Sequence, residues 1–523
     1  MRRSTLLIST GLCLCIASPD SRAQGSEEAR LAAIEKQIQA LQSELVRVRR
    51  DLATSRTELR QARQSRPAPA PAATPASLPS QQAAGGAAPP VSSSVAPPQV
   101  QTAGSPAPGG VSFPNGRPTF TSNDGRFSAA VGLQLHYDVG GYFTDSGNRN
   151  AQPTRLNTFG QNLRRARLPF VFKYDDFTIN VTPDFGGSPD GSPTLYEANI
   201  NYSPKGTPLA PLTATLGYFK PWLTLGDSTS SNAFLFLERP SIVEASRNIA
   251  GGDARSSIGA RWAENRYVLA AYLTGAPYGS QTAALAQPQQ TGATFRVAGR
   301  PLVSEDMDLH LGFSGSDAFR IQRTSSGQTL TVQDRPELRI DTNRLVSTGG
   351  LNADSAYTYG PEVAFRYRNF LVQGEYIRIG VNRTAGTTAA PTPDLQFDGG
   401  YVEGSWVITG EPRRYVSTDG AFNNPKVAHP LKEGGLGAFE LVARYSHISL
   451  NDKVTRGVAA SVTGGVFGGE QTVYSAGLNW YPNDYLRLML DYDVVNVDRL
   501  NAAGTTQIGR RFQAVALRAQ AAF

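Results

Sequence analysis

The feature that most constrains this chain is a period-two alternation of apolar and polar residues in its final segment, Gly509 to Phe523. Successive side chains of a β-strand point to opposite sides, so such a segment has two different faces. The apolar face carries Val515, Leu517, Ala519, Ala521 and Phe523, and the other carries Ala514, Ala516, Arg518 and Gln520. One face suits lipid and the other suits water. In lipid, such a strand needs paired neighbours on both edges, which a closed sheet provides.

The segment ends on Phe523, and in this it resembles the last strand of a Gram-negative outer-membrane barrel. The terminal aromatic residue resembles the signal that the barrel-insertion machinery reads. The composition agrees, because 52 Gly and 20 Tyr suit short strands, turns and aromatic girdles. After residue 17 the chain has no apolar run of the roughly 20 residues that a membrane-spanning helix needs. We therefore expect strands to cross the membrane.

Alternating segments upstream predict an all-β fold, a sixteen-stranded antiparallel transmembrane β-barrel. The expected strands lie near residues 126–138, 163–173, 176–184, 194–203, 212–219, 256–263, 265–274, 291–299, 306–315, 357–368, 370–381, 398–410, 439–450, 471–481, 485–498 and 507–523. Bacterial barrels have an even number of strands, short periplasmic turns and long external loops. The long connections at 140–162, 220–255, 316–356 and 451–470 fit the external side. Segment 411–438 is long as well, yet falls on the periplasmic side.

Residues 1–23 have the features of a secretory signal peptide, with Arg2 and Arg3 followed by an apolar run. Both cysteines, Cys13 and Cys15, lie within that run, so the exported chain would contain none. A lipoprotein signal at Cys13 is the alternative, although the preceding Leu12 is larger than the usual small residue. We expect export to the Gram-negative outer membrane, with the N-terminal region in the periplasm.

Residues 24–66 are expected to form a periplasmic α-helical coiled coil. Apolar residues recur at alternating steps of three and four, at Leu31, Ile34, Ile38, Leu41, Leu45, Val48 and Leu52, and more weakly at Ser55, Leu59 and Ala62. This heptad pattern predicts self-association through a helix roughly 48 Å long, and it permits a trimer. A lone amphipathic helix is the alternative.

Residues 67–118 are expected to be an extended Pro/Ala/Ser-rich linker, because no charged residue occurs between Pro67 and Gly116. The barrel would then occupy residues 119–523. The linker is a simple spacer on this interpretation, and it separates two independent modules.

Three stretches resemble the phosphate- and polyphosphate-selective porin family. They are LGYFKPWLTLGDSTSSNAFLFLERP at 216–240, YVEGSWVITGEPRRY at 401–415 with GAFELVARYSHISL from Gly437, and GLNWYPNDYLRLMLDYDVVNV at 477–497 with the closing RAQAAF. Their order and spacing hold across roughly residues 120–523. The resemblance implies a homotrimer of sixteen-stranded barrels, each with a third external loop folded inward. On our strand count that constriction loop is 220–255, with the basic residues Lys220, Arg239, Arg247 and Arg255.

The pore wall is expected to be rich in arginine, since the chain has 43 Arg and only 7 Lys. A guanidinium group keeps its charge and offers a rigid fork of donors to phosphate or carboxylate oxygens. The strand phases turn Arg165, Arg167, Arg261, Arg296, Arg366, Arg444, Arg487 and Arg518 into the lumen, where such groups offer an anion successive weak sites. The family resemblance adds Arg164, which together with Arg165 matches the double-Arg motif of the second strand.

A structural role is the competing interpretation for these arginines. The same phases turn acids inward, at Glu197, Asp308, Glu362, Glu375, Glu403, Glu440, Asp491 and Asp493. Arginines could pair with them across neighbouring strands. In the third loop, Asn232 follows Ser230 and Ser231 at a position where a lysine would strengthen a phosphate site. The residues therefore favour anion preference more than phosphate specificity.

Other kinds of chemistry have little support in the sequence. The four histidines lack metal-ligand spacing, and there is no P-loop or nucleophile elbow. His447 shares the lipid-facing phase of a strand, where a role in the aromatic belt outweighs a hydrolase site. We expect no enzyme activity, no metal or other cofactor and no nucleic-acid partner.

The sequence predicts an outer-membrane porin for passive diffusion of small anions, with phosphate as one candidate. Its expected partners are outer-membrane lipid, two further copies of the chain and the permeating anions. The competing hypothesis is a structural barrel with a general, non-selective pore, which acts as a periplasmic tether or spacer through its coiled coil. In that case the coiled coil would contact the periplasm or the peptidoglycan.

Overall fold

The computed structural model describes residues 109–147, 155–186, 193–280, 289–324, 327–386 and 392–523. The chain divides into two compact units, Met1–Pro98 and Gln99–Phe523, and the fold described below belongs to the second. The expected signal peptide at 1–23, the coiled coil at 24–66 and the linker up to residue 108 lie outside the described residues.

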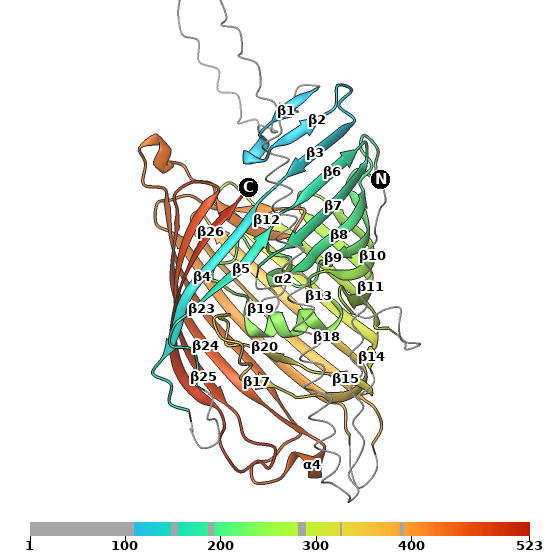
Figure 1. Cartoon of the computed structure of the whole chain (residues 1–523), viewed down its shortest axis with the longest axis vertical. Coiled ribbons are helices and arrows are strands. Elements are labelled where there is room, and N and C mark those ends of the chain that lie inside the picture. Colours follow the sequence, from blue (N-terminus) through green and yellow to red (C-terminus); the bar gives the residue numbers. More distant parts are fainter. Residues whose placement is uncertain (1–108, 148–154, 187–192, 281–288, 325–326, 387–391) are drawn as a thin grey trace, which may run out of the picture. The chain divides into compact units, whose positions relative to one another are not determined.

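The second unit is a closed antiparallel barrel of sixteen strands (Figure 1). Its first strand is bent into β3 (Phe127–Val131) and β4 (Gln134–Phe143), and its second into β5 (Gly160–Arg167) and β6 (Phe170–Tyr174). The others are β7 (Phe177–Asp184), β8 (Thr194–Tyr202), β9 (Leu212–Phe219), β10 (Arg255–Ala263), β11 (Tyr267–Pro277), β12 (Thr291–Val303), β13 (Met307–Arg320), β18 (Leu351–Tyr367), β19 (Phe370–Arg383), β20 (Leu395–Val407), β23 (Ala438–Asp452), β24 (Val466–Tyr481), β25 (Leu486–Asp498) and β26 (Arg510–Ala522). Pairing of β26 with β4 closes the barrel.

The predicted number, order and direction of the strands are confirmed. Several strands extend beyond their predicted ends at the end of the barrel that carries the long loops, called here the loop end. β18, for example, begins at Leu351, six residues before the predicted 357, where it pairs with β15 (Gly327–Leu330). The opposite end carries the short turns and is called the turn end. In outer-membrane barrels the long loops face outside and the short turns face the periplasm.

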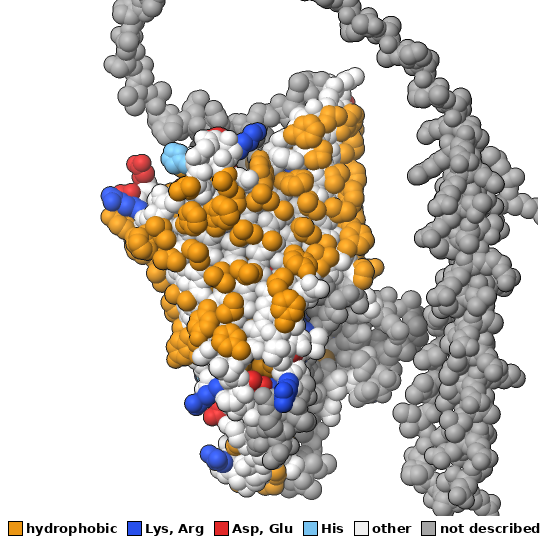
Figure 2. All heavy atoms as spheres, turned by 60° about the vertical axis from the view of Figure 1, so that its left-hand side comes forward, with side chains coloured by type: hydrophobic (Ala, Val, Ile, Leu, Met, Phe, Trp, Pro, Cys, Tyr) orange, Lys and Arg blue, Asp and Glu red, His pale blue; other side chains and the backbone are white. Residues whose placement is uncertain are grey.

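The outer face of the barrel is apolar because outward and inward residues alternate along each strand. One outward row crosses β9, β10 and β11 at Leu216, Ile258 and Leu273, which are 56%, 53% and 62% exposed. Figure 2 shows a broad hydrophobic band on one outer face of the barrel, with charged side chains near the two ends of the band. The alternation thus places apolar side chains where lipid would lie.

A small flange extends the sheet at the turn end. It consists of β1 (Gly110–Ser112), η1 (Pro114–Gly116) and β2 (Thr119–Thr121), and β2 pairs with β3. Because β3 pairs with β6 while β4 pairs with β26, the flange lies beside the closed wall, beyond the end of β26 (Figure 1). Residues 109–118, which the sequence assigned to the linker, thus include β1 and η1.

Three segments fold into the barrel. The constriction segment, residues 220–254, contains α2 (Leu225–Ser228) and α3 (Ser241–Ala250). The second inward loop, residues 321–324 and 327–350, contains β14 (Arg323–Thr324), β15, β16 (Gln333–Asp334) and β17 (Val346–Ser347). The inward hairpin comes from the turn end and consists of β21 (Arg413–Val416) and β22 (Ala421–Pro425). Segment 411–438 is therefore on the predicted side, and its extra length folds into the lumen.

The inside of the barrel is apolar toward the loop end. Ile242 and Ile249 of α3 lie in one buried cluster with Leu338 of the second inward loop and with Ile377 and Phe397 of the wall. The lumen therefore departs from the expected polar wall wherever the inward loops cover it. η2 (Leu431–Glu433) and α4 (Ala460–Thr463) lie in the connections. No helix in the described ranges is long and apolar enough to cross a membrane.

Candidate functional site

The constriction segment is held across the lumen by carboxylates of the wall. Glu375 on β19 accepts hydrogen bonds from the backbone N–H groups of Leu225 (3.0 Å) and Gly226 (2.6 Å) at the start of α2. Asp491 on β25 accepts another from the N–H of Leu237 (2.7 Å). Two acids that the sequence predicted to point inward thus bind the backbone of the loop.

Ion pairs within the constriction segment fix its shape. Arg247 binds Asp227 at 2.5 Å and Asp253 at 2.6 Å. Burial alone would raise the pKa of Asp253, but Arg247 and Arg167 hold it well below its ordinary value. Arg255, the first residue of β10, donates to the backbone carbonyl of Gly251 in the segment at 2.6 Å. Much of the positive charge of the segment is therefore engaged within it.

The second inward loop is bonded to the constriction segment and helps to hold it in place. Its Glu337 pairs with Arg444 of β23 at 2.6 Å and accepts from the N–H of Ser241 at 2.9 Å. Its Arg339 pairs with Glu244 of α3 at 2.9 Å. Burial alone would raise the pKa of Glu244, but Arg247 and Arg339 lower it to about 2, so this carboxylate is ionised.

The inward hairpin is fixed to the wall on two sides. Arg413 at its base pairs with Glu440 of β23 at 3.2 Å, and Arg296 of β12 donates to the carbonyl oxygens of Asp419 and Gly420 at its tip, each at 2.7 Å. Tyr415 bonds to His310 at 2.8 Å, on the same side as Arg296. The hairpin is a bonded part of the lumen.

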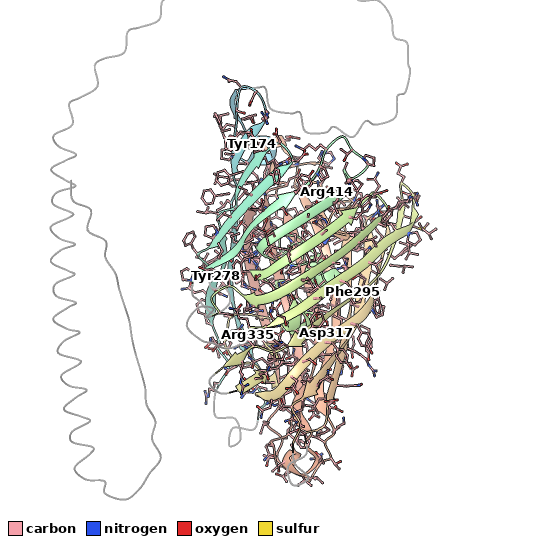
Figure 3. The ribbon with its side chains drawn as sticks, turned by 90° about the vertical axis from the view of Figure 1, so that its right-hand side faces the viewer. Tyr174, Tyr278, Phe295, Asp317, Arg335 and Arg414 are labelled. Atoms are coloured by element: carbon pink, nitrogen blue, oxygen red, sulfur yellow. The ribbon has the colours of Figure 1, made fainter. Side chains whose placement is uncertain are left out.

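The loop-side cavity lies on the loop-end side of the constriction segment and has a volume of about 380 Å³. It is lined by Arg164, Arg167, Arg239, Arg247, Arg335, Arg339 and Arg344, and by Asp184, Glu244, Asp253 and Asp334 among the acids. Arg335 lies toward the loop end in Figure 3, whereas Tyr174 and Arg414 lie toward the turn end. Burial and the neighbouring Arg339 lower the pKa of Arg335 to about 9.

A β-bulge turns two consecutive arginines inward on β5. His136 of β4 pairs with Arg165, but the next residue of β4, Tyr137, pairs with Leu163, so that Arg164 is the extra residue. Such a bulge lets neighbouring side chains share one face. Arg164 and Arg165 are both buried. The strand phase alone predicted only Arg165, and the family motif supplied Arg164.

Arg164 belongs to an ion-pair network centred on Glu238 of the constriction segment. Glu238 binds Arg164 at 2.6 Å, Arg518 at 3.1 Å and Arg339 at 3.3 Å. Arg518 also binds Asp138 at 2.6 Å. Burial alone would raise the pKa of Glu238, but these arginines hold it well below its ordinary value.

Arg165 is different, because no carboxylate in the described residues lies within ion-pair distance of it. Its Nη1 donates to Nδ1 of His136 at 3.1 Å, and its buried Nε has no hydrogen-bond partner among those residues. His136 must then carry its proton on Nε2, which lies 2.9 Å from Oδ1 of Asn232. Arg165 therefore contributes a positive charge that no described carboxylate neutralises directly.

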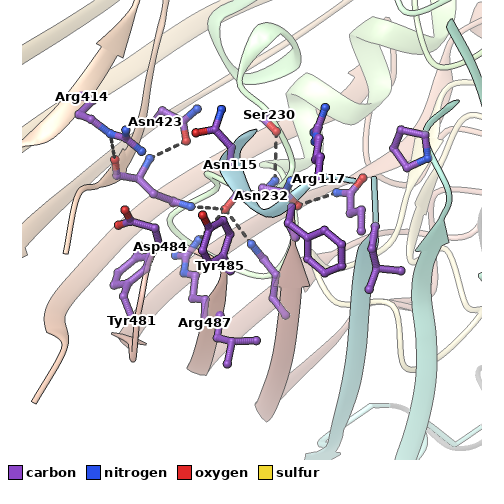
Figure 4. A pocket seen from close by; sticks show the side chains of 18 residues that line it. Asn115, Arg117, Ser230, Asn232, Arg414, Asn423, Tyr481, Asp484, Tyr485 and Arg487 are labelled. Atoms are coloured by element: carbon purple, nitrogen blue, oxygen red, sulfur yellow. Dashed lines mark hydrogen bonds between the residues drawn. The ribbon is translucent and has the colours of Figure 1, made fainter. Parts of the chain in front are cut away.

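A second cavity, called here the turn-side cavity, has a volume of about 540 Å³. Gln134, Ser230, Asn232, Arg487 and Gln520 are among the residues that line it (Figure 4). Arg167 of the loop-side cavity donates to Gln134 at 3.4 Å. The hydrogen-bonded residues Gln134, His136, Arg165 and Arg167, called here the junction, thus link the linings of the two cavities.

The structure places the thirteen basic residues predicted from the sequence in two groups. Nine are ion-paired within the described chain: Arg164, Arg167, Arg239, Arg247, Arg296, Arg366, Arg444, Arg487 and Arg518. The other four make other contacts. Arg165 contacts His136, Arg261 lies over the Trp222 ring, Lys220 donates to the carbonyl of Asp227, and Arg255 binds backbone carbonyls.

The predicted inward acids explain much of this pairing. Glu362 binds Arg296 at 2.6 Å, Asp308 binds Arg366 at 2.7 Å, and Glu440 binds Arg413 at 3.2 Å. Glu403 lies 3.7 Å from Arg444. Glu197, in contrast, accepts from Thr182 at 2.9 Å. The structural role considered in the sequence therefore applies to most inward arginines.

Sequence reasoning missed several residues that contribute to the site. His136 was set aside as an isolated histidine, and Arg335, Arg339, Arg344 and Arg413 lie in connections whose inward course was not predicted. The run DRPELR at 334–339 was the available signal, because two arginines in a long loop suggest a charged partner. Among the described residues, no group of three or more His, Cys, Asp and Glu side chains could hold a metal ion.

Comparison with protein families gives one match, to the family described as phosphate-selective porin O and P, over residues 130–523. Among curated proteins, the chain is 27% identical over 478 residues to an uncharacterized protein of Caulobacter vibrioides, an alignment that covers 88% of this chain and 85% of that protein. It is 23% identical over 405 residues to Porin O of Pseudomonas aeruginosa, covering 72% of this chain and 85% of that protein.

Solved structures with a similar barrel include OmpT of Vibrio cholerae, with a TM-score of 0.46 and 10% identity, covering 76% of this chain and 98% of that one. An anion-selective porin from Comamonas acidovorans has a TM-score of 0.44 and 10% identity, covering 76% of this chain and 100% of that one.

Proposed function

Because the chain belongs to the phosphate-selective porin O and P family and is an outer-membrane porin, we propose that it passes small anions by diffusion, with phosphate among them. It is a channel rather than an enzyme. The proposed path runs from the loop-side cavity through the junction to the turn-side cavity. Anions would be guided by Arg164, Arg165, Arg167 and the other inward arginines.

Arg165 is the observation that carries the proposed anion preference. Arg165 is 2% exposed, belongs to the junction that links the linings of the two cavities, and has no ion-paired acid among the described residues. A buried polar group without a partner is costly. A passing anion would supply the missing acceptor, and it would leave again because each contact is shallow.

Reversal potentials in a potassium chloride gradient across a planar bilayer test this proposal. We expect the native pore to favour chloride, and Arg165→Gln to reduce the chloride-to-potassium permeability ratio by about fivefold. One charge contributes about 1 kcal/mol at about 4 Å in water, which corresponds to about fivefold. Arg368→Gln, at an exposed turn where Arg368 pairs with Asp306, is the matched control. A native pore that favours potassium would contradict the proposal.

Phosphate as a substrate has a separate test. Millimolar phosphate should reduce chloride current through the native pore if the junction binds it, since charge bias alone produces no block. Asn232 lies here with Ser230 and Ser231, and its amide supplies no positive charge. We therefore expect the block to be weak, and Asn232→Lys to strengthen it.

We also propose that the protein is a homotrimer whose N-terminal region lies in the periplasm, with assembly by the barrel-insertion machinery. The heptad repeat at 24–66 supports self-association. A role as a periplasmic tether through that segment, in contact with the peptidoglycan, is the second candidate. Deletion of residues 24–98 separates the two roles: the pore should conduct unchanged, while altered envelope integrity would support the tether.

A further inference from the structure

The turn-side cavity is rich in amides, which distinguishes it from the arginine-rich loop-side cavity. Its six amide side chains come from η1, β4, the constriction segment, the inward hairpin and β26: Asn115, Gln134, Asn232, Asn423, Asn424 and Gln520 (Figure 4). Each amide offers both donors and an acceptor. Segments far apart in the sequence thus bring neutral hydrogen-bonding groups to one place.

Several of these amides are held in position by one another. The carbonyl oxygen of Asn232 accepts from Asn424 at 3.0 Å and from Gln520 at 2.9 Å, and its side-chain Oδ1 accepts from Gln134 at 2.7 Å. This leaves the Nδ2 group of Asn232 without a described partner. The side-chain amide nitrogen of Asn423 and both polar atoms of Asn115 are equally uncommitted within the described chain. The cavity is therefore a preformed set of free donors and acceptors.

Two guanidinium groups in the cavity have free ends. Arg414 donates through Nε to the carbonyl of Asn424 at 3.2 Å, which leaves its terminal nitrogens available. Arg117 is exposed, and its side chain has no hydrogen-bond or ion-pair partner in the described ranges. Arg487, in contrast, donates to the carbonyls of Asn232 and Leu235. Arg117 and Arg414 can therefore each attract an anionic group, and the amides remain for neutral oxygens.

The one acid in the lining, Asp484, distinguishes between ligands. One of its carboxylate oxygens accepts from the N–H of Val427 at 2.9 Å, and the other is free in the described structure. A bare phosphate ion is repelled by this charge. A hydroxyl group, however, can donate a hydrogen bond to it, and bonds to charged acceptors are the stronger ones.

We infer that the turn-side cavity is a subsite for a small phosphorylated polyol, of the size of a monosaccharide phosphate. Its phosphoryl group is attracted by Arg117 and Arg414, and its hydroxyl groups bond to the free amides and to Asp484. The cavity of about 540 Å³ is within the range of small-molecule sites and larger than a single phosphate ion requires. This inference rests on the proposed anion pore and names a class of solute for it.

Block of chloride current through the full-length protein in planar bilayers tests the inference. Three probes are added on the turn side: glucose 6-phosphate, inorganic phosphate, and cyclohexyl phosphate, which has a ring of the same size and a phosphoryl group but no free hydroxyls. Glucose 6-phosphate should block at a concentration about fivefold lower than cyclohexyl phosphate, the gain that one hydrogen bond typically brings.

Asp484→Asn supplies the sharper measurement, since asparagine keeps the acceptor for Val427 but removes the charge. Block by inorganic phosphate should strengthen, while the advantage of glucose 6-phosphate over cyclohexyl phosphate should shrink. Asp498→Asn, at the loop end of β25, is the matched control and should change neither. Arg117→Gln, at an exposed position, should weaken block by all three phosphates.

The outcomes separate this inference from the proposed function. Equal block by glucose 6-phosphate and cyclohexyl phosphate would overturn the polyol subsite while leaving an anion pore in place. If Asp484→Asn strengthened block by all three probes equally, the subsite would again be refuted, because simple electrostatics would suffice. Absence of any block together with a potassium-selective native pore would overturn the proposed function as well.

Discussion

The charge of an inward arginine is available to a solute only where no carboxylate already holds it. Arg296 donates to Glu362 and to two backbone carbonyls, so its guanidinium fixes the inward hairpin. Arg165, next to the bulged and ion-paired Arg164, has His136 as its only side-chain hydrogen-bond partner among the described residues. Two arginines that are adjacent in sequence therefore differ in role, because Glu238 lies within ion-pair distance of Arg164 but not of Arg165.

We expect Glu238 to stabilise the fold and to reduce the anion selectivity of the pore. Glu238→Gln removes the shared partner of Arg164, Arg339 and Arg518, and loss of one partner of a buried pair typically costs about 3–5 kcal/mol. We expect a lower free energy of unfolding in urea, followed by tryptophan fluorescence in detergent. The chloride-to-potassium permeability ratio should rise, since the constriction gains one net positive charge. Glu433→Gln, at an exposed turn, should change neither quantity.

Lys220 should make anion preference depend on pH. The pKa of Lys220 is lowered to about 8, chiefly by burial. The positive charges of Arg239 and Arg247 also lower it, whereas the negative charges of Asp227 and Asp253 raise it. Lys220 is therefore charged at pH 7 and loses its charge as the pH rises through about 8. The permeability ratio for chloride should fall over that interval. In Lys220→Arg the fall should disappear, and a wild-type ratio that stays constant through this range would contradict the assignment.

For single residues, the sequence predicted the direction in which side chains point better than it predicted which groups they bind. A period of two follows from the strand itself, so the inward position of Arg296, Arg444 and Arg518 could be read directly. Their partners include Glu337 and Glu238, which lie in loops whose inward course has no periodic signal. Arg164 shows the other limit, because a bulge changes the phase within one strand.

At the scale of elements, the lumen is narrowed from both ends. The constriction segment and the second inward loop enter from the loop end, while the inward hairpin enters from the turn end. The hairpin is attached through Arg413 to Glu440 and through its tip to Arg296. A side chain at its base and the backbone at its tip are bonded to the wall, so the hairpin forms a fixed part of the constriction.

Removal of the inward hairpin should widen the pore. Replacing residues 411–437 by a short turn joins β20 to β23, which are already paired. Single-channel conductance in molar potassium chloride should increase. The anion preference should persist, because Arg165 lies on β5 outside the deleted segment. An unchanged conductance would show that the hairpin does not obstruct the path. Trimming of the exposed loop 453–465 is the control.

The strands were predictable because lipid enforces the alternation over each membrane-spanning segment. All sixteen were found, including β20 and β23 on either side of the long segment at 411–438. Where a strand continues past the membrane, as β18 does from Leu351, this constraint ends, and the predicted strand is shorter than the observed one. The inward course of 321–350 and of the hairpin depends on tertiary ion pairs, which no local pattern records.

For the whole molecule, the flange continues the apolar outer surface beyond the closed barrel. An outward row runs along paired residues from Val111 on β1 through Phe120, Ala129, Phe172 and Ile179 to Ile200. Val111 is 67% exposed and Phe120 is 49% exposed. The neighbouring strands β7, β8 and β9 have 8, 9 and 8 residues, whereas β18 has 17. A membrane-spanning strand needs about 9–11 residues, so this side is the shorter wall.

The shorter wall with its flange is where the proposed trimer should make contact. The expected coiled coil precedes the flange in the chain, so its self-association would tether three copies of the barrel to one another through the linker. A photo-crosslinking amino acid in place of Phe120 should therefore link two copies of the chain covalently. When two differently tagged chains are produced together, denaturing gels should show a crosslinked band that carries both tags. The same group in place of Leu478, outward on the long strand β24, should give only lipid adducts. Crosslinking at Phe120 should persist after deletion of residues 24–98 if the barrel wall itself forms the contact. Lipid adducts alone at Phe120 would show instead that the flange faces the membrane and that any trimer forms elsewhere.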